Sequence, residues 1–259
     1  MTLVVSLRIP DGIIIAADSL ASIPGKLGVV ANFDTQCPVC KNKINLKDIA
    51  MPPIPVPGAT SSFAQKLFSL KKRFGIATVG MGVLTHRTIY YHMKGLEKKI
   101  EDITEVSKVA PIILDYFDTE IRKEIKNIDQ APDDFFPLGF QVVGYDGDNG
   151  KTIEIKVGKK SRLQHIEGIG CTVSGETDLV IQMWELGKKD PRRATNYARF
   201  SLQDAIDYAH FLITATAEYQ RFTNIMPSVG GEVDIALVTP FHNFRWIKYK
   251  ELTKVLEEV

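Results

Sequence analysis

The segments of this chain that are typical of β-strands come in adjacent pairs, and those typical of helices also come in pairs. Short turns rich in Gly, Pro, Asp, Asn or Lys join the strands of each pair, which favours antiparallel hairpins over parallel crossovers. The expected strands are residues 3–9 and 13–17, 66–70 and 74–79, 138–145 and 151–157, and 232–239 and 244–248; the expected helices are 83–100, 105–128, 174–186, 201–221 and 251–258. We therefore predict an α+β fold, a four-layer α-β-β-α sandwich of two stacked antiparallel sheets.

Residues 19–62 interrupt this order, because they are rich in proline and show no sustained period. A structureless loop of that length is uncommon inside a compact domain. We therefore expect a single domain over residues 1–259 with an insertion at about 19–62. Its apolar residues can cover a neighbouring subunit at low cost in ordering, because proline already restricts the free chain. They are Ile49, Met51, Ile54 and Val56, and they lead us to expect a homo-oligomer with the insertion at or beside a subunit contact.

The charge of the chain is balanced, with 32 Lys and Arg against 31 Asp and Glu and a net charge of +1. Such a balance provides no basic surface for nucleic acid or for an anionic membrane. Arg8 and Asp11 interrupt the apolar N-terminal segment before it could form a signal-peptide core or a membrane span. Three cysteines cannot close a disulfide framework. We therefore predict a cytoplasmic protein that binds neither nucleic acid nor membrane.

A set of residues in the first two hairpins has a distinctive spacing. Thr2 follows Met1 directly, Asp18 closes the first hairpin after Ala16 and Ala17, and Gly80 lies fourteen residues beyond Lys66. With Asp11-Gly12 in the first turn, this set resembles the proteasome β-subunit family of N-terminal nucleophile hydrolases. The resemblance covers most of the chain outside the insertion, and it implies the same four-layer fold.

The resemblance also implies a role for each residue of the set. After removal of Met1, the hydroxyl of Thr2 would be the nucleophile, and its α-amine, with an ordinary pKa of about 7.7–8.0, the base. The charge of Lys66 would stabilise the alkoxide, and Asp18 would keep Lys66 charged and oriented. The backbone N–H of Gly80 would bind the developing oxyanion. No cofactor is required by this chemistry.

Each of these residues also has an ordinary structural interpretation. A threonine at position 2 is common, Asp18 could cap a turn, Lys66 could be a surface lysine, and Gly80 could end a strand. It is their joint spacing within two hairpins that favours the catalytic interpretation.

Downstream, the match to proteasome subunits is looser. Ser174 resembles the family's serine beside the threonine amine, but it could equally be the N-cap of the helix expected at 174–186. Before Gly230-Gly231, the family's serine and aspartate are replaced by Val229 and Met226. The run from Asn224 through Ser228, together with Gly175-Glu176, looks more like the bacterial Anbu group, the ancestral β-subunit branch. This departure concerns the support of the threonine amine.

Cys37 and Cys40 form a Cys-Pro-Val-Cys knuckle, which offers half of a tetrahedral zinc site. Cys171 is far away in the sequence, and the five histidines show no ligand spacing. Zinc would need ligands from another subunit or from histidines brought near by folding. The alternatives are a redox pair, which lacks a thioredoxin-like context, and a small apolar turn.

The favoured function is therefore that of a proteasome-like threonine peptidase or amidase, acting on a peptide or protein substrate in a homo-oligomeric ring or open helix. By resemblance, Ala21, Ala64, Thr78 and Gly82 would line the substrate pocket. The alternatives are a catalytically inactive assembly or binding protein that keeps Met1, and an acyl-transferring peptide ligase of the same fold. The sequence identifies no unfoldase partner.

Overall fold

A computed structural model describes residues 2–27, 35–36, 43–44, 54–100, 103–224 and 226–250. The chain divides into two units, one of Met1–Ala21 with Ser61–Val259 and the other of Ser22–Thr60. In the smaller unit, β3 (Ala21–Leu27) pairs with β6 (Ile54–Ser61), and β4 (Thr35–Gln36) pairs with β5 (Lys43–Ile44).

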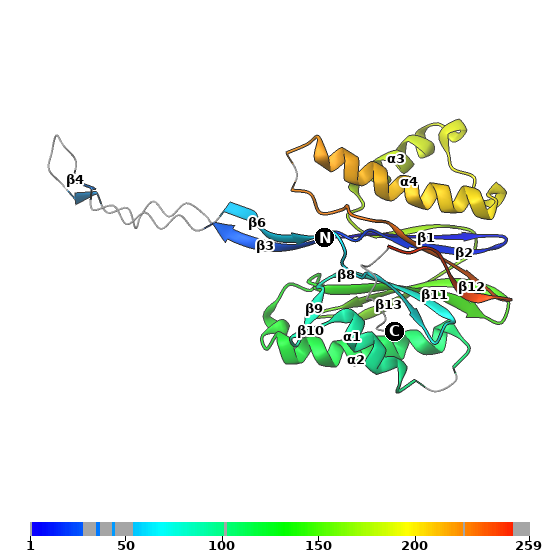
Figure 1. Ribbon diagram of the computed structural model, residues 1–259, viewed down its shortest axis with the longest axis horizontal. Helices are drawn as coiled ribbons and strands as arrows, with labels where there is room; N and C mark the ends of the chain where they lie inside the picture. Colours follow the sequence, from blue (N-terminus) through cyan, green and yellow to red (C-terminus); the bar gives the residue numbers. More distant parts are fainter. Residues whose placement is uncertain are drawn as a thin grey trace, which may run out of the picture. The chain divides into compact units, whose positions relative to one another are not determined.

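Two five-stranded antiparallel sheets form the larger unit (Figure 1). The first has the order β14 (Gly170–Gly175), β1 (Leu3–Ile9), β2 (Gly12–Ala17), β15 (Asp234–Thr239) and β16 (Asn243–Lys248). The second has the order β13 (Arg162–Glu167), β12 (Asn149–Val157), β11 (Leu138–Asp146), β8 (Phe74–Gly80) and β7 (Leu67–Leu70).

Helices cover the outer faces of the two sheets (Figure 1). α3 (Asp178–Lys189) and α4 (Leu202–Arg221) pack on the first sheet, whereas α1 (Ile89–Glu97) and α2 (Val106–Glu124) pack on the second. Short elements complete the unit: β9 (Val83–Leu84), β10 (Arg87–Thr88), and the 3₁₀ helices η2 (Ile128–Gln130), η3 (Pro191–Arg193) and η4 (Tyr197–Arg199). The predicted α+β sandwich of four layers is thereby confirmed.

Strand β1, which begins one residue after Thr2, is buried on both of its faces. All seven of its residues are buried, because helices cover one of its faces and the second sheet covers the other. Leu3, Val5 and Leu7 belong to the cluster beneath α4, while Val4 belongs to the cluster between the sheets. This alternation is the two-residue period of a strand. Thr2, the residue before β1, is therefore joined to a strand whose backbone is held on both faces.

Three helix predictions were wrong in detail. The segment 83–100 begins with the β9–β10 hairpin, and its helix occupies only Ile89–Glu97. The segment 174–186 begins in strand β14, and its helix starts at Asp178. The segment 105–128 is helical only to Glu124, but it continues through Pro111, because its buried face, including Val109 and Ile113, offsets the lost hydrogen bond. The helix expected at 251–258 lies outside the described residues.

Among the described helices, none has both the length and the apolar character needed to cross a membrane.

Candidate active site

Thr2 lies immediately before β1, and its backbone is fixed on both sides. Its carbonyl accepts a hydrogen bond from the N–H of Glu176 at 2.8 Å. The next N–H, that of Leu3, donates to Oδ1 of Asp18 at 3.1 Å. Thr2 is only 2 % exposed. Any chemistry at Thr2 would therefore take place at a residue that is held in position.

Gly175 at the end of β14 allows this close approach. Its φ is +97°, and a Cβ at this position would lie 1.8 Å from the carbonyl oxygen of Thr2. Only a glycine fits here without displacing the N-terminal backbone. β14 pairs with β1 so that Gly175 lies opposite Leu3. The register of these two strands therefore positions Thr2.

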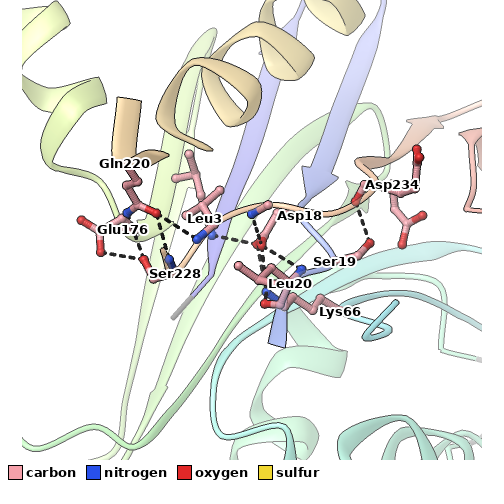
Figure 2. A network of polar contacts seen from close by, with 12 residues as sticks. Leu3, Asp18, Ser19, Leu20, Lys66, Glu176, Gln220, Ser228 and Asp234 are labelled. Carbon is pink, nitrogen blue, oxygen red and sulfur yellow. Dashed lines mark hydrogen bonds and ion pairs between the residues drawn. The ribbon is translucent and has the colours of Figure 1, made fainter. Parts of the chain in front are cut away.

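Asp18 and Lys66 form a buried ion pair beside this backbone (Figure 2). The Lys66 ammonium donates to both carboxylate oxygens at 3.0 Å and to the carbonyl of Leu20 at 2.5 Å. The backbone N–H groups of Leu3, Leu20 and Gly230 also donate to the carboxylate, each at 3.1 Å. The structure thus brings together Thr2, Asp18 and Lys66, because the N–H that follows Thr2 shares the carboxylate with Lys66.

Burial dominates the electrostatics of this pair. It raises the pKa of Asp18, while the charge of Lys66 and the N–H donors to the carboxylate oppose the shift. Burial likewise lowers the pKa of Lys66, and Asp18 opposes that shift. Lys250 adds to the lowering of the Lys66 pKa through like-charge repulsion. Each member of the pair therefore keeps its charge mainly through the other.

The segment 228–230 departs from the proteasome pattern, and its Ser228 lies beside Gln220 and Glu176 (Figure 2). Oε1 of Gln220, near the end of α4, accepts from the N–H groups of Ser228 at 2.9 Å and Val229 at 3.1 Å. The hydroxyl of Ser228 donates to Glu176 at 3.2 Å. Gly230, as noted, donates to Asp18. The segment therefore connects Glu176, which donates to the Thr2 carbonyl, with Asp18, which pairs with Lys66.

Gly80 ends β8 with a φ of +95°, and a Cβ there would lie 2.2 Å from the carbonyl oxygen of Pro137. Gly80 and Gly175 line the same cavity of about 410 Å³. The glycine predicted to bind the oxyanion and the glycine that contacts Thr2 thus border one space. This arrangement is compatible with the predicted role of Gly80.

Ser174 lies in β14, opposite Val4, so its alternative interpretation as a helix N-cap is wrong. Its hydroxyl donates to Glu154 at 2.5 Å and accepts from the side-chain amide of Gln141 at 2.7 Å. Both partners come from the second sheet. Within the described residues, its contacts therefore join the two sheets, and a role beside the threonine amine stays a prediction.

None of the four residues predicted to line a substrate pocket is among the residues that line the 410 Å³ cavity. Thr78 is buried, and its N–H donates to the carbonyl of Lys66 at 2.9 Å. The N–H of Ala64 donates to the carbonyl of Ser19, also at 2.9 Å. Ala21 is half-buried and Gly82 is exposed. Ala21 and Ala64 are thus close in sequence to Asp18 and Lys66, respectively, and Thr78 is hydrogen-bonded to Lys66. The role of all four residues in a substrate pocket stays a prediction.

The zinc prediction is not tested, because Cys37 and Cys40 lie outside the described residues. Cys171 lies in β14, where burial raises the pKa of its thiol to about 12. In the described part of the chain, no group of three or more His, Cys, Asp or Glu residues could hold a metal ion.

Sequence reasoning missed three polar side chains of the site region. Gln220 is 2 % exposed and supports segment 228–230. Lys250 and Asp234 form a second buried ion pair, and the N–H of Lys250 also donates to Asp234 at 2.9 Å. Asp234 lies opposite Ala17, next to Asp18. No sequence pattern distinguishes Lys250 from the nearby surface lysines.

Comparison with known proteins supports the fold. No protein-family model and no curated protein matches the chain. Among solved structures, a mutant of Anbu from Hyphomicrobium sp. strain MC1 is similar, with a TM-score of 0.58 and 14 % sequence identity. The alignment covers 99 % of this chain and 89 % of the other. At this identity, the likeness concerns the fold.

Proposed function

We propose that this chain is a threonine-type N-terminal nucleophile hydrolase that cleaves peptide or amide bonds with Thr2, after removal of Met1. The observation that carries the proposal is the position of Thr2 between two fixed partners. Its carbonyl is bound by Glu176, and the following N–H shares the Asp18 carboxylate with the buried Lys66 ammonium. A firmly held hydroxyl residue next to a buried cation is suited to nucleophilic catalysis.

The first half of the reaction forms an ester. The α-amine of Thr2 takes the proton of its own hydroxyl, and the oxygen attacks the substrate carbonyl carbon. The Lys66 ammonium lowers the energy of the negative charge on the oxygen. The N–H of Gly80 donates to the oxyanion of the tetrahedral intermediate. The C–N bond then breaks, the leaving amine takes the proton, and the acyl group remains on the threonine oxygen.

The second half restores the enzyme. Water gives a proton to the α-amine and attacks the ester carbon, and the threonine oxygen leaves and regains a proton as the acid product departs. Asp18 keeps the charge of Lys66 near the reacting oxygen throughout both halves. All groups in this scheme belong to the chain, the substrate or water.

Self-association completes the proposal, with a peptide or protein substrate and a cytoplasmic location. Exposed aromatic side chains on and just after α4 support assembly, since such groups are more common at interfaces than on the free surface. They are Phe211, Tyr219 and Phe222, of which Phe222 is 80 % exposed.

Intact mass spectrometry of the purified full-length protein tests the requirement for a free threonine. The proposal expects a chain lighter by one methionine residue. Thr2→Leu supplies the reference mass of the unprocessed form, because a large second residue hinders removal of Met1. Retention of Met1 in the whole wild-type sample would favour an inactive assembly protein instead.

A further inference from the structure

The 410 Å³ cavity next to Gly80 and Gly175 is also lined by Glu154, a half-buried residue of β12. Gly175, one of the residues that line the cavity, lies against the carbonyl of Thr2, whereas Thr2 itself is not part of the lining. None of the steps described above uses Glu154.

Hydrogen bonding leaves this carboxylate with spare acceptor capacity. The amide of Gln141 donates to Ser174, and the single proton of Ser174 donates to Oε1 of Glu154. Oε2 of Glu154 accepts no hydrogen bond from the described residues, and Oε1 of the fully buried Gln141 also lacks a donor. Of these two acceptors, only the one on Glu154 belongs to a residue that lines the cavity, and an N–H donor of a ligand there would satisfy it.

The charges around Glu154 are also unbalanced. Lys156 lines the same cavity, but its ammonium lies over the ring of Phe136 at 5.9 Å. Within the described residues it forms no ion pair with Glu154. A second carboxylate, that of Asp134, lines the cavity and likewise has no ion-pair partner among the described residues. The cavity lining thus holds two carboxylates and one ammonium group, while the guanidinium of Arg162, which is not part of the lining, lies over the same Phe136 ring at 5.0 Å.

We propose that this cavity binds a positively charged group of the substrate, an ammonium or a guanidinium, and that Glu154 is its main acceptor. The assignment of the ligand to the substrate rests on the proposed function, because Gly80, the proposed oxyanion donor, lines the cavity. A cation there donates to the free oxygen of Glu154 and neutralises a carboxylate in a partly dry site.

Binding of small probes to the full-length protein tests the proposal without requiring turnover. Benzylamine, benzyl alcohol and phenylacetate have similar sizes but are a cation, a neutral molecule and an anion. We expect benzylamine to bind at least about tenfold more tightly than benzyl alcohol, as for a hydrogen-bonded charge in a partly buried site. In Glu154→Gln the ratio should fall to below about threefold.

Two further variants complete the design. Glu185→Gln removes an exposed carboxylate of α3, changes the net charge equally and should keep the tenfold preference. Lys156→Met removes the competing cation and should increase the preference for benzylamine, so the test does not depend on the folding of Glu154→Gln. Equal binding of benzylamine and benzyl alcohol, a preference for phenylacetate, or an unchanged ratio in both cavity variants would overturn the proposal.

Peptide probes then identify the source of the cation. Peptides with lysine or norleucine on either side of the central amide compete with benzylamine, and the position at which lysine improves competition locates the group. Thr2→Ala should show the same preference, since binding needs no nucleophile. A benzylamine preference without any adduct at Thr2 would count against the proposed hydrolase alone, whereas an adduct without the preference would count against the cation site alone.

Discussion

Lys66→Met removes the ammonium group that contacts both oxygens of Asp18 and keeps an apolar side chain of similar length. Asp18 has no exposed surface, so its carboxylate would lose its ion-pair partner in a dry environment. Breaking a buried pair by removing one partner costs about 3–5 kcal/mol. Two of the five hydrogen bonds to this carboxylate come from Lys66, and three come from backbone N–H groups that remain. We therefore expect a loss near the lower limit, about 3 kcal/mol.

The same variant should change how stability depends on pH. Burial already raises the pKa of Asp18, and the charge of Lys66 opposes that shift. Without Lys66, the pKa of the folded state rises further above its ordinary value of about 3.9. The folded variant then keeps a proton that the unfolded chain has released. Its stability is thus highest below the unfolded pKa and falls as the pH rises through the interval up to the folded pKa.

Urea unfolding, followed by the fluorescence of Trp184 and Trp246 at one fixed protein concentration, measures both effects. Lys188→Met is the matched control, because it breaks an exposed pair with Glu185 and should cost almost nothing. In the double variant with Asp18→Asn, the loss should be about 2 kcal/mol smaller than the sum of the two single losses. A loss below about 1 kcal/mol for Lys66→Met, with additive double-variant energies, would refute the buried-pair reasoning.

Three other variants test the surrounding structure. Gly175→Ala places a Cβ 1.8 Å from the carbonyl oxygen of Thr2 at a positive φ, and it should lower the free energy of unfolding in urea by at least about 2 kcal/mol. Gly147→Ala is the control, because Gly147 also has a positive φ but lies in open space, and it should cost only about 1 kcal/mol. Equal losses in the two variants would show that the clash at position 175 relaxes. Gln220→Ala removes the acceptor of two buried N–H groups in segment 228–230. It should lower the free energy of unfolding by about 2 kcal/mol and slow any labelling of the nucleophile. Wild-type stability together with a wild-type labelling rate would show that the segment does not need Gln220. Replacing residues 24–60 by a short Gly-Ser bridge should shift the particle toward monomers or dimers in multi-angle light scattering, and an unchanged number of subunits per particle would place the insertion away from subunit contacts.

Much of the fold could be predicted because its central strands have strong local signals. β1 is apolar except for Ser6 and Arg8, β2 is apolar throughout, and a Pro-Asp-Gly turn joins them. Strands β13 and β14, which belong to different sheets, were missed for the opposite reason. β13 reads Arg-Leu-Gln-His-Ile-Glu and is largely exposed at the edge of its sheet, so it has no apolar pattern. The pairing of β14 with β1 depends on tertiary contacts that no local pattern encodes.

The candidate site was likewise predicted only in part from the sequence. Asp18 and Lys66 were identified by their spacing in two hairpins, and the ion pair implied by the family resemblance is present. Gln220 was missed, because a glutamine near the end of a helix is ordinarily exposed, and here it is the approach of segment 228–230 that buries it. Lys250 was missed for a similar reason, since only the folded sheet brings it to Asp234.

Treatment of the full-length protein with a peptide epoxyketone tests the central claim most directly. This electrophile joins both the hydroxyl and the α-amine of an N-terminal threonine, so a stable adduct requires the nucleophile and the base together. We predict one adduct per chain, located by peptide mass spectrometry at Thr2 of the processed protein, with slower labelling of Thr2→Ser and none of Thr2→Ala. A processed chain that forms no adduct, or an adduct that persists at the N-terminus of Thr2→Ala, would contradict the assignment of Thr2 as the nucleophile.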